Sequence, residues 1–331
     1  MCRLKFKVLL FIILIQNTTT LLATFSQATE YHDLSSLVSE IRKLKRDSEV
    51  REVTLTTGGK GYFKPFYSLE GAEKPGKVHK HEIAAYQLDQ LLGMNLISTT
   101  SAVRIKMNAE SELIDGSFQA HSLGETAHEI KKRDKTFKKS ENLKFFDYLL
   151  GNCDRHYHNF LVHDGKEVAI DNGLAFSSRH CRHNITMYFN GFIDDSYPEA
   201  QTLLAKLSKN PPLQVLEKIK STSNSEFRKA LELLSEDEFL EFIDRKNHAL
   251  LRQAILAGSV VSNLPEILAL IPKNLKLMND PDADATTLLS LAESLGQTDV
   301  IKALVNAGAK HHNCPTCSRS PIKRLCPNQL L

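Results

Sequence analysis

Cysteine is scarce in this chain: 331 residues contain six, and tryptophan is absent. Six cysteines are too few for a dense disulfide framework at this length. With 42% apolar and 24% charged residues, the composition supports a sizeable core and excludes a wholly disordered chain. Three cysteines, Cys314, Cys317 and Cys326, gather near the C-terminal end, where a zinc site, a disulfide and free thiols all remain open alternatives.

A strong charge of one sign is also missing. The formal net charge is +3, and the first 28 residues hold three cations and no acidic residue, so the remainder is neutral. This balance gives no indication of a general nucleic-acid-binding surface, and we expect no nucleic-acid partner. The basic run 131–139 is typical of a solvated loop, with docking of an acidic partner as the less favoured alternative.

Long hydrophobic runs are absent too, which excludes a protein with many membrane spans. The apolar run 8–15 follows three cations and precedes the small residues Ser26 and Ala28. This layout is typical of a secretory signal cleaved after Ala28. A retained signal-anchor is the alternative, and only in that case do we expect the membrane as a partner. The layout therefore predicts a secreted protein or one of a secretory lumen.

The secondary-structure pattern changes along the chain. Strand-like segments at 53–55, 62–63 and 101–107 accompany helical patterns at 34–45, 81–92 and 141–150, whereas residues after 201 are almost purely helical. Strands first and helices later predict a two-lobed α+β domain followed by an all-α tail. We divide the chain into a signal peptide or signal-anchor, an N-lobe, a C-lobe, a helical tail and a cysteine-containing end, at 1–28, 29–110, 111–240, 241–310 and 311–331.

The helical tail has a repeat-like pattern. Residues 287–292 with Gly296, followed by residues 299–309, resemble one ankyrin repeat, and residues 250–270 resemble a fainter copy. If the tail is ankyrin-like, we expect it to bind a protein or to brace the preceding domain. An ordinary helical hairpin that completes the domain is the alternative.

The most informative segment is a predicted hairpin between residues 159 and 171. Asp164-Gly165 is a strong signal for a tight two-residue turn, and counting back from it places Asn159 opposite Ile170. Asn159 and Asp171 then lie side by side at the open end of the hairpin. Asp154 lies in the loop immediately before it.

This group of side chains suits metal-assisted phosphate chemistry. Carboxylate and amide oxygens are ligands that Mg²⁺ prefers, alongside substrate phosphates. Asp171 and Asn159 are therefore the predicted metal ligands. Asp154 is the predicted catalytic residue that orients an attacking hydroxyl and accepts its proton. The alternative is that these aspartates only cap strand ends, as Asp often does in turns.

A phosphate-binding cation should complete such a site. Lys64, at the end of a predicted strand, is the candidate, and Glu82, on the first turn of the next helix, is its predicted partner. Lys60 is the competing choice for the cation. Gly58, Gly59 and Gly61 lie in the preceding turn and are predicted to cover the nucleotide phosphates together with Lys64.

Three stretches, 63–65, 82–89 and 146–156, together resemble the secretory-pathway kinases, the group of the Golgi casein kinase and the four-jointed proteins. More distantly, the region is similar to phosphoinositide 3- and 4-kinases and to bacterial HipA-type kinases. The resemblance covers roughly residues 50 to 180. It implies a two-lobed protein-kinase-like fold, with Lys64 binding nucleotide phosphates, Glu82 positioning Lys64, Asp154 catalytic, and Asp171 and Asn159 holding the metal. Asn172-Gly173 follows Asp171, in place of the Phe-Gly of ordinary protein kinases.

The sequence thus predicts an atypical kinase that uses ATP with Mg²⁺ or Mn²⁺ to phosphorylate a hydroxyl, with Ser or Thr of a protein as the expected substrate. The alternatives are a phosphoinositide kinase with the same core and a pseudokinase or scaffold that acts through its tail. Because a bacterial periplasm lacks ATP, export requires either a nucleotide-supplied secretory lumen or delivery of a bacterial effector into a host cell.

Overall fold

The computed structural model describes residues 31–44, 50–66, 78–152, 154–176, 211–257, 268–273, 278–279 and 286–310. The segments expected to be a signal at 1–28 and a cysteine-containing end at 311–331 lie outside the described residues. The chain divides into two compact units, Met1–Ile243 and Asp244–Leu331. The boundary falls within helix α8 (Glu236–Leu256).

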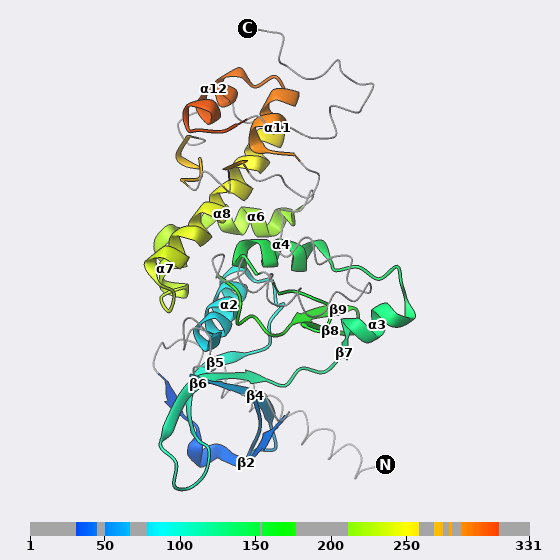
Figure 1. The fold of residues 1–331 in the computed structure, drawn as a ribbon, viewed down its shortest axis with the longest axis vertical. Coiled ribbons are helices and arrows are strands. Elements are labelled where there is room, and N and C mark those ends of the chain that lie inside the picture. The colour runs from blue at the N-terminus through cyan, green and yellow to red at the C-terminus, as the bar shows by residue number, and fades with distance from the viewer. Residues whose placement is uncertain are drawn as a thin grey trace, which may run out of the picture. The chain divides into compact units, whose positions relative to one another are not determined.

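Unit 1 begins with a six-stranded sheet of order β1-β5-β6-β4-β3-β2, which curls on itself (Figure 1). Side chains alternate between its two faces, and one face forms a buried apolar cluster of Leu34, Val53, Leu55, Phe63, Val103, Ile105 and Phe118. The strands are β1 (His32–Asp33), β2 (Val38–Lys43), β3 (Arg51–Leu55), β4 (Lys60–Pro65), β5 (Thr100–Lys106) and β6 (Leu113–Ala120).

The helix predicted at 34–45 is wrong. The structure has a single 3₁₀ turn, Ser35–Leu37, followed by strand β2 at the edge of the sheet. A register irregularity lies between Val38 and Glu40, and both Val38 and Ile41 pack against the apolar cluster. Because a bulge adds a residue, side chains three apart face the same way and imitate the spacing of a helix.

Helix α2 (Val78–Leu92) carries Glu82, the predicted partner of Lys64. The prediction of a helix at 81–92 is confirmed. Buried residues lie around much of its circumference, including polar ones such as Glu82 and Asp89. The Asp89 carboxylate accepts hydrogen bonds from the backbone N–H groups of Leu96 and Ile97. These bonds fix the connection from α2 into β5, and thereby the helix against the sheet.

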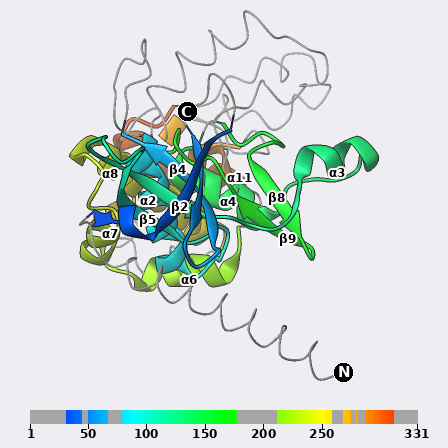
Figure 2. The ribbon, with the colours of Figure 1, turned by 90° about the horizontal axis from the view of Figure 1, so that it is seen from below.

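The remainder of unit 1 contains a three-stranded sheet of order β7-β8-β9 and several helices. Figure 2 shows α3, β8 and β9 grouped together. Helix α4 has the predicted bounds, with Ser140 as its side-chain N-cap and Gly151 as a left-handed C-cap. The elements are β7 (Glu125–Thr126), α3 (Ala127–Arg133), α4 (Glu141–Leu150), β8 (Phe160–His163), β9 (Lys166–Ala169), α6 (Leu213–Ser221) and α7 (Asn224–Ala230).

Unit 2 contains a helical hairpin of α11 (Leu288–Ser294) and α12 (Thr298–Asn306). Thr287 caps α11 in a capping box with Ser290. A buried apolar cluster, which includes Leu251, Leu289 and Leu304, holds the unit together. The α tail is thus helical where it is described, but its assignment to ankyrin repeats finds no support beyond this hairpin. The mixed α+β class of the preceding unit is confirmed.

No helix among the described residues is long and apolar enough to cross a membrane.

Candidate active site

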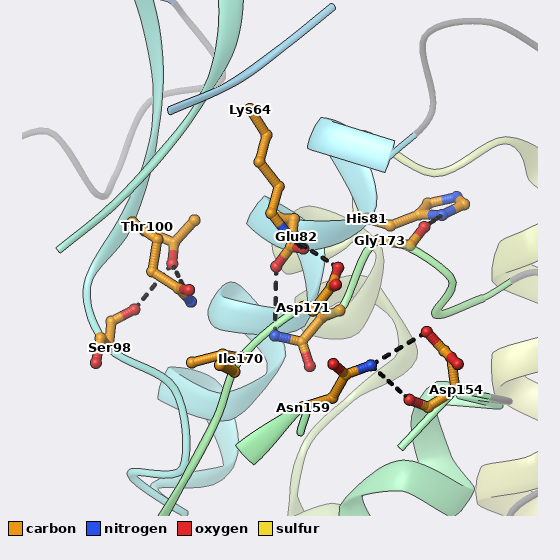
Figure 3. A network of polar contacts seen from close by, with 12 residues as sticks. Lys64, His81, Glu82, Ser98, Thr100, Asp154, Asn159, Ile170, Asp171 and Gly173 are labelled. Carbon is orange, nitrogen blue, oxygen red and sulfur yellow. Dashed lines mark hydrogen bonds and ion pairs between the residues drawn. The ribbon is translucent and has the colours of Figure 1, made fainter. Parts of the chain in front are cut away.

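Lys64 lies at the centre of a group of charged side chains at the end of β4 (Figure 3). Its ammonium contacts the carboxylate of Glu82 on α2 and lies 2.8 Å from Oδ1 of Asp171, which follows β9. The Glu82 side chain is 2% exposed, so Lys64 rather than water balances its charge. Burial opposes the charge on Lys64, but Asp171 and Glu82 outweigh it and raise its pKa above the usual value. The ammonium is therefore charged at neutral pH.

The β8–β9 hairpin has the predicted register. The backbone N–H of Ile170 donates to the carbonyl of Asn159 at 3.0 Å, and both residues of the Asp164-Gly165 turn have positive φ. Asn159 and Asp171 therefore lie next to each other at the open end. Asp171 also has a φ of 57°, a left-handed backbone that non-glycine residues seldom adopt and that clusters at functional sites.

Asp154 and Asn159 are held together by two hydrogen bonds. Nδ2 of Asn159 donates to the Asp154 carbonyl at 2.7 Å and to its carboxylate at 3.1 Å. Burial, with a further contribution from the negative charge of Asp171, raises the pKa of Asp154 to about 6. The carboxylate therefore carries its charge at neutral pH but accepts a proton more readily than an ordinary aspartate, which suits a general base.

The three glycines do not join this group. Gly58 and Gly59 lie in the turn between β3 and β4, whereas Lys64 lies at the other end of β4. The separation along the strand is roughly 16 Å at the usual rise per residue. Gly61 has a packing role, because a Cβ atom there would lie 2.3 Å from the ring of Phe118. The geometry therefore does not support the predicted contact of these glycines with phosphates at Lys64.

Sequence reasoning gave no role to a second, buried network beneath these residues. Arg155 donates from Nε to Asp147 on α4 at 3.0 Å, and its other nitrogens donate to the carbonyls of Asn159 and Ile170 and to Oδ1 of Asn172. One guanidinium thus fixes α4, both strands of the hairpin at its open end, and the residue after Asp171. Asp147 was the available signal, because a carboxylate on the apolar face of α4 requires a buried partner.

The donor set fits a hard divalent cation. Asp171 offers a carboxylate, and because Nδ2 of Asn159 is directed at Asp154, its carboxamide oxygen is the atom suited to a metal. Mg²⁺ and Mn²⁺ accept such oxygens and take further ligands from phosphates and water. Within the described ranges, no three or more His, Cys, Asp or Glu side chains form a metal-binding group.

Comparison with known proteins places this geometry in context. Residues 73–202 match the family model "Phosphatidylinositol 3- and 4-kinase". That range contains Glu82, Asp154, Asn159 and Asp171, and it begins shortly after Lys64. No curated protein sequence matches the chain.

Several solved structures are similar to the chain at low identity. The Golgi casein kinase with Mn/ADP bound has a TM-score of 0.41 at 15% identity, covering 64% of this chain and 71% of that one. Hydra Fam20 with sugar gives 0.42 at 14% identity, covering 73% and 89%. The Helicobacter pylori proinflammatory kinase CtkA gives 0.42 at 13% identity, covering 69% and 99%.

The Golgi casein kinase, which the sequence was seen to resemble, is thus among the solved structures found. The more distant resemblance to phosphoinositide kinases is confirmed by the family model, whose range contains every predicted site residue of this group except Lys64. The enzyme class expected from the sequence follows from that match: the chain is an atypical kinase.

Proposed function

We propose that this kinase transfers the γ-phosphoryl group of ATP to a serine or threonine hydroxyl of a protein substrate. One observation carries the proposal. A candidate phosphate-binding cation, Lys64, contacts the Asp171 carboxylate, and the negative charge of Asp171 also acts on the candidate base, Asp154, which comes from a distant part of the chain from Lys64. A general base, a cation and metal ligands in one site are what phosphoryl transfer requires.

Each side chain has a distinct part in the transfer. Asp154 accepts the proton of the attacking hydroxyl while the new O–P bond forms, and the bond from the γ-phosphorus to the bridging oxygen breaks to release ADP. Lys64, held by Glu82, binds the nucleotide phosphates. Asp171 and Asn159 would hold Mg²⁺ or Mn²⁺, which neutralises charge on the phosphate oxygens. Positioning and charge neutralisation supply most of the rate.

A protein substrate rests on the resemblance of the three sequence stretches to the secretory-pathway kinases, and a lipid substrate is the competing outcome. The test is phosphate transfer from labelled ATP by the full chain, offered a mixture of unfolded acceptor proteins or phosphatidylinositol vesicles, with Asp154→Asn beside it. Label on protein, lost in the variant, supports the proposal. Label on vesicles alone overturns the protein assignment, and nucleotide binding without transfer to either overturns the phosphotransferase assignment.

We propose further that the protein works in a secretory compartment. The support is the predicted signal at 1–28, cleaved after Ala28. N-terminal sequencing of the mature protein checks this proposal. A mature chain beginning at Thr29 supports it, and an intact Met1 on a protein recovered entirely from the cytosol contradicts it.

A further inference from the structure

Asn172 forms a fully buried bridge between two charged groups. Its side chain is 0% exposed. Its oxygen accepts a hydrogen bond from Nη2 of Arg155, and its Nδ2 donates to Oε2 of Glu82 at 3.4 Å. The amide thus connects a buried cation to a buried anion.

The amide satisfies both neighbours because it has a donor and an acceptor. A guanidinium offers donors alone, and an ionised carboxylate offers acceptors alone. The asparagine oxygen must therefore face Arg155 and its nitrogen must face Glu82. A carboxylate at position 172 would keep the bond to Arg155 but set two negative groups against each other at Glu82. An apolar side chain would leave both charged groups short of a partner.

The bridge determines how Glu82 can serve Lys64. One oxygen of Glu82 contacts the Lys64 ammonium, and the other accepts from Asn172. Because both oxygens are engaged, the carboxylate cannot rotate without losing a buried contact. The position of the ammonium therefore depends on a residue that does not touch it.

The far side of the bridge is rigid. Arg155 is held by Asp147 on α4 and by the carbonyls of Asn159 and Ile170 at the open end of the β8–β9 hairpin. Asn172 is thus fixed with respect to Asp154 and Asn159, the candidate base and metal ligand. Through its hydrogen bond to Glu82, Asn172 therefore fixes the position of α2 relative to these two residues.

The residues on either side of Asn172 also contact α2 or its partner lysine. Asp171 contacts Lys64, and the carbonyl of Gly173 lies 2.9 Å from Nδ1 of His81. A Cβ atom at position 173 would lie 2.4 Å from Cγ1 of Val78, so glycine allows this close approach. Three consecutive residues after β9 therefore tie the metal-ligand strand to the helix that carries Glu82.

We propose that Asn172 is a positioning residue of the nucleotide site: it orients Glu82, and through Glu82 it places the Lys64 ammonium where nucleotide phosphates bind. The inference rests on the proposed nucleotide site and adds a residue to it. In an ordinary protein kinase a phenylalanine follows the metal-binding aspartate, whereas in this chain the same position is a polar link to the helix.

The test is a double-mutant cycle read as the dissociation constant for ATP with Mn²⁺, measured by calorimetry on the full chain. The variants are Asn172→Asp, Glu82→Gln and both together. Asn108→Asp is the matched control, since Asn108 lies in an exposed loop and an aspartate keeps its acceptor for the Glu110 N–H. We expect Asn172→Asp to weaken nucleotide binding at least tenfold and Asn108→Asp to leave it unchanged.

The double variant separates positioning from a general structural role. With Gln at 82 and Asp at 172, the donor and the acceptor are exchanged, so the hydrogen bond is restored. We therefore expect the double variant to bind nucleotide no more weakly than Glu82→Gln alone. Losses that multiply across the two sites, or an unchanged constant in a folded Asn172→Asp, would overturn the inference.

Two further measurements keep the outcome clear. Thermal melting without nucleotide shows whether each variant folds. If Asn172→Asp does not fold, Asn172→Ala, which removes the bridge without adding charge, takes its place with the same expected direction. Failure of the wild type to bind ATP would overturn the proposed nucleotide site itself, whereas wild-type binding that Asn172 variants leave intact overturns only the role of Asn172.

Discussion

The β3–β4 and β8–β9 hairpins place their functional side chains in the same way. In each, the turn lies at the closed end and the functional side chains lie at the open end: Lys64 is the penultimate residue of β4, and Asn159 and Asp171 flank the open end of β8–β9. The glycines of the turns, Gly58 and Gly165, have a positive φ, which lets the backbone reverse direction there. The comparison teaches that a glycine-rich turn next to a site residue in sequence can lie a full strand away from it in space.

Removing the base at the open end should have the largest effect. Asp154→Asn keeps the shape of the side chain but cannot accept the proton of the hydroxyl, so kcat should fall by about 10²- to 10⁴-fold. Nucleotide affinity should stay within about threefold of the wild type, because the proposed role of Asp154 is at the acceptor hydroxyl and not at the nucleotide. Steady-state kinetics with calorimetry check this split. A variant that loses affinity and keeps kcat would place Asp154 in nucleotide binding.

The two lysines of β4 provide a matched pair at opposite ends of one strand. Lys64→Met removes the cation that contacts Glu82 and Asp171, and we expect nucleotide affinity to fall by about 10²-fold. Lys60→Met changes an exposed lysine whose side chain is 55% accessible, and the affinity should not change. Equal losses in both variants would contradict the assignment of the phosphate cation to the open end.

The acidity of the site gives a test by pH. Burial and Asp171 raise the pKa of Asp154 to about 6, and the base must be unprotonated to act. The pH dependence of kcat/KM reports the pKa of the enzyme free of nucleotide and metal. We therefore expect kcat/KM to be constant above about pH 6 and to fall about tenfold per pH unit well below it. In Asp154→Asn this acidic limb should be absent from the residual activity. An identical acidic limb in that variant would assign it to another group.

A bound cation should move that titration. Asp171 contributes to the raised pKa of Asp154 through its negative charge, and a divalent metal on Asp171 would reverse the sign of that interaction. The limb seen in kcat should therefore lie at lower pH than the limb in kcat/KM. Matched profiles at saturating and at limiting nucleotide measure the difference, and a shift to higher pH would contradict a metal at Asp171.

The smallest effect on the site should come from the closed end of β3–β4. Gly58→Ala forces a non-glycine residue into a φ of 84°, which should cost about 1 kcal/mol of unfolding free energy. Gly61→Ala should cost about 1–3 kcal/mol because the added methyl group meets the Phe118 ring. Neither change should alter the nucleotide dissociation constant of the folded protein by more than about twofold, since both lie away from Lys64. Denaturant melts and calorimetry separate the two quantities.

Local chemistry explains which parts of the fold were predictable. The Asp164-Gly165 turn sets the register of its hairpin, so the juxtaposition of Asn159 with Asp171 could be counted from the sequence. The helix at Glu141–Leu150 was predictable too, because the residues that cap it, Ser140 and Gly151, are its neighbours in the sequence. Strand β2 was not, because the irregularity after Val38 gives a strand the spacing of a helix.

The buried network shows where sequence reasoning ended. Arg155 joins Asp147, eight residues earlier, to Asn172, and Asn172 reaches Glu82, 90 residues earlier. No local spacing connects residues that far apart. The apolar side chains around them indicate only that buried charges must be paired, and the fold decides which partner each one finds.

The most direct test of the account is the thermal stabilisation of the full chain by ATP with Mg²⁺ or Mn²⁺, measured beside Asp171→Ala. A ligand that binds only the native state raises the melting temperature. The account predicts a metal-dependent shift in the wild type that is lost in a folded Asp171→Ala. A wild type that melts at the same temperature with and without nucleotide, or a shift of equal size in both proteins, would contradict a kinase site at the open ends of these two hairpins.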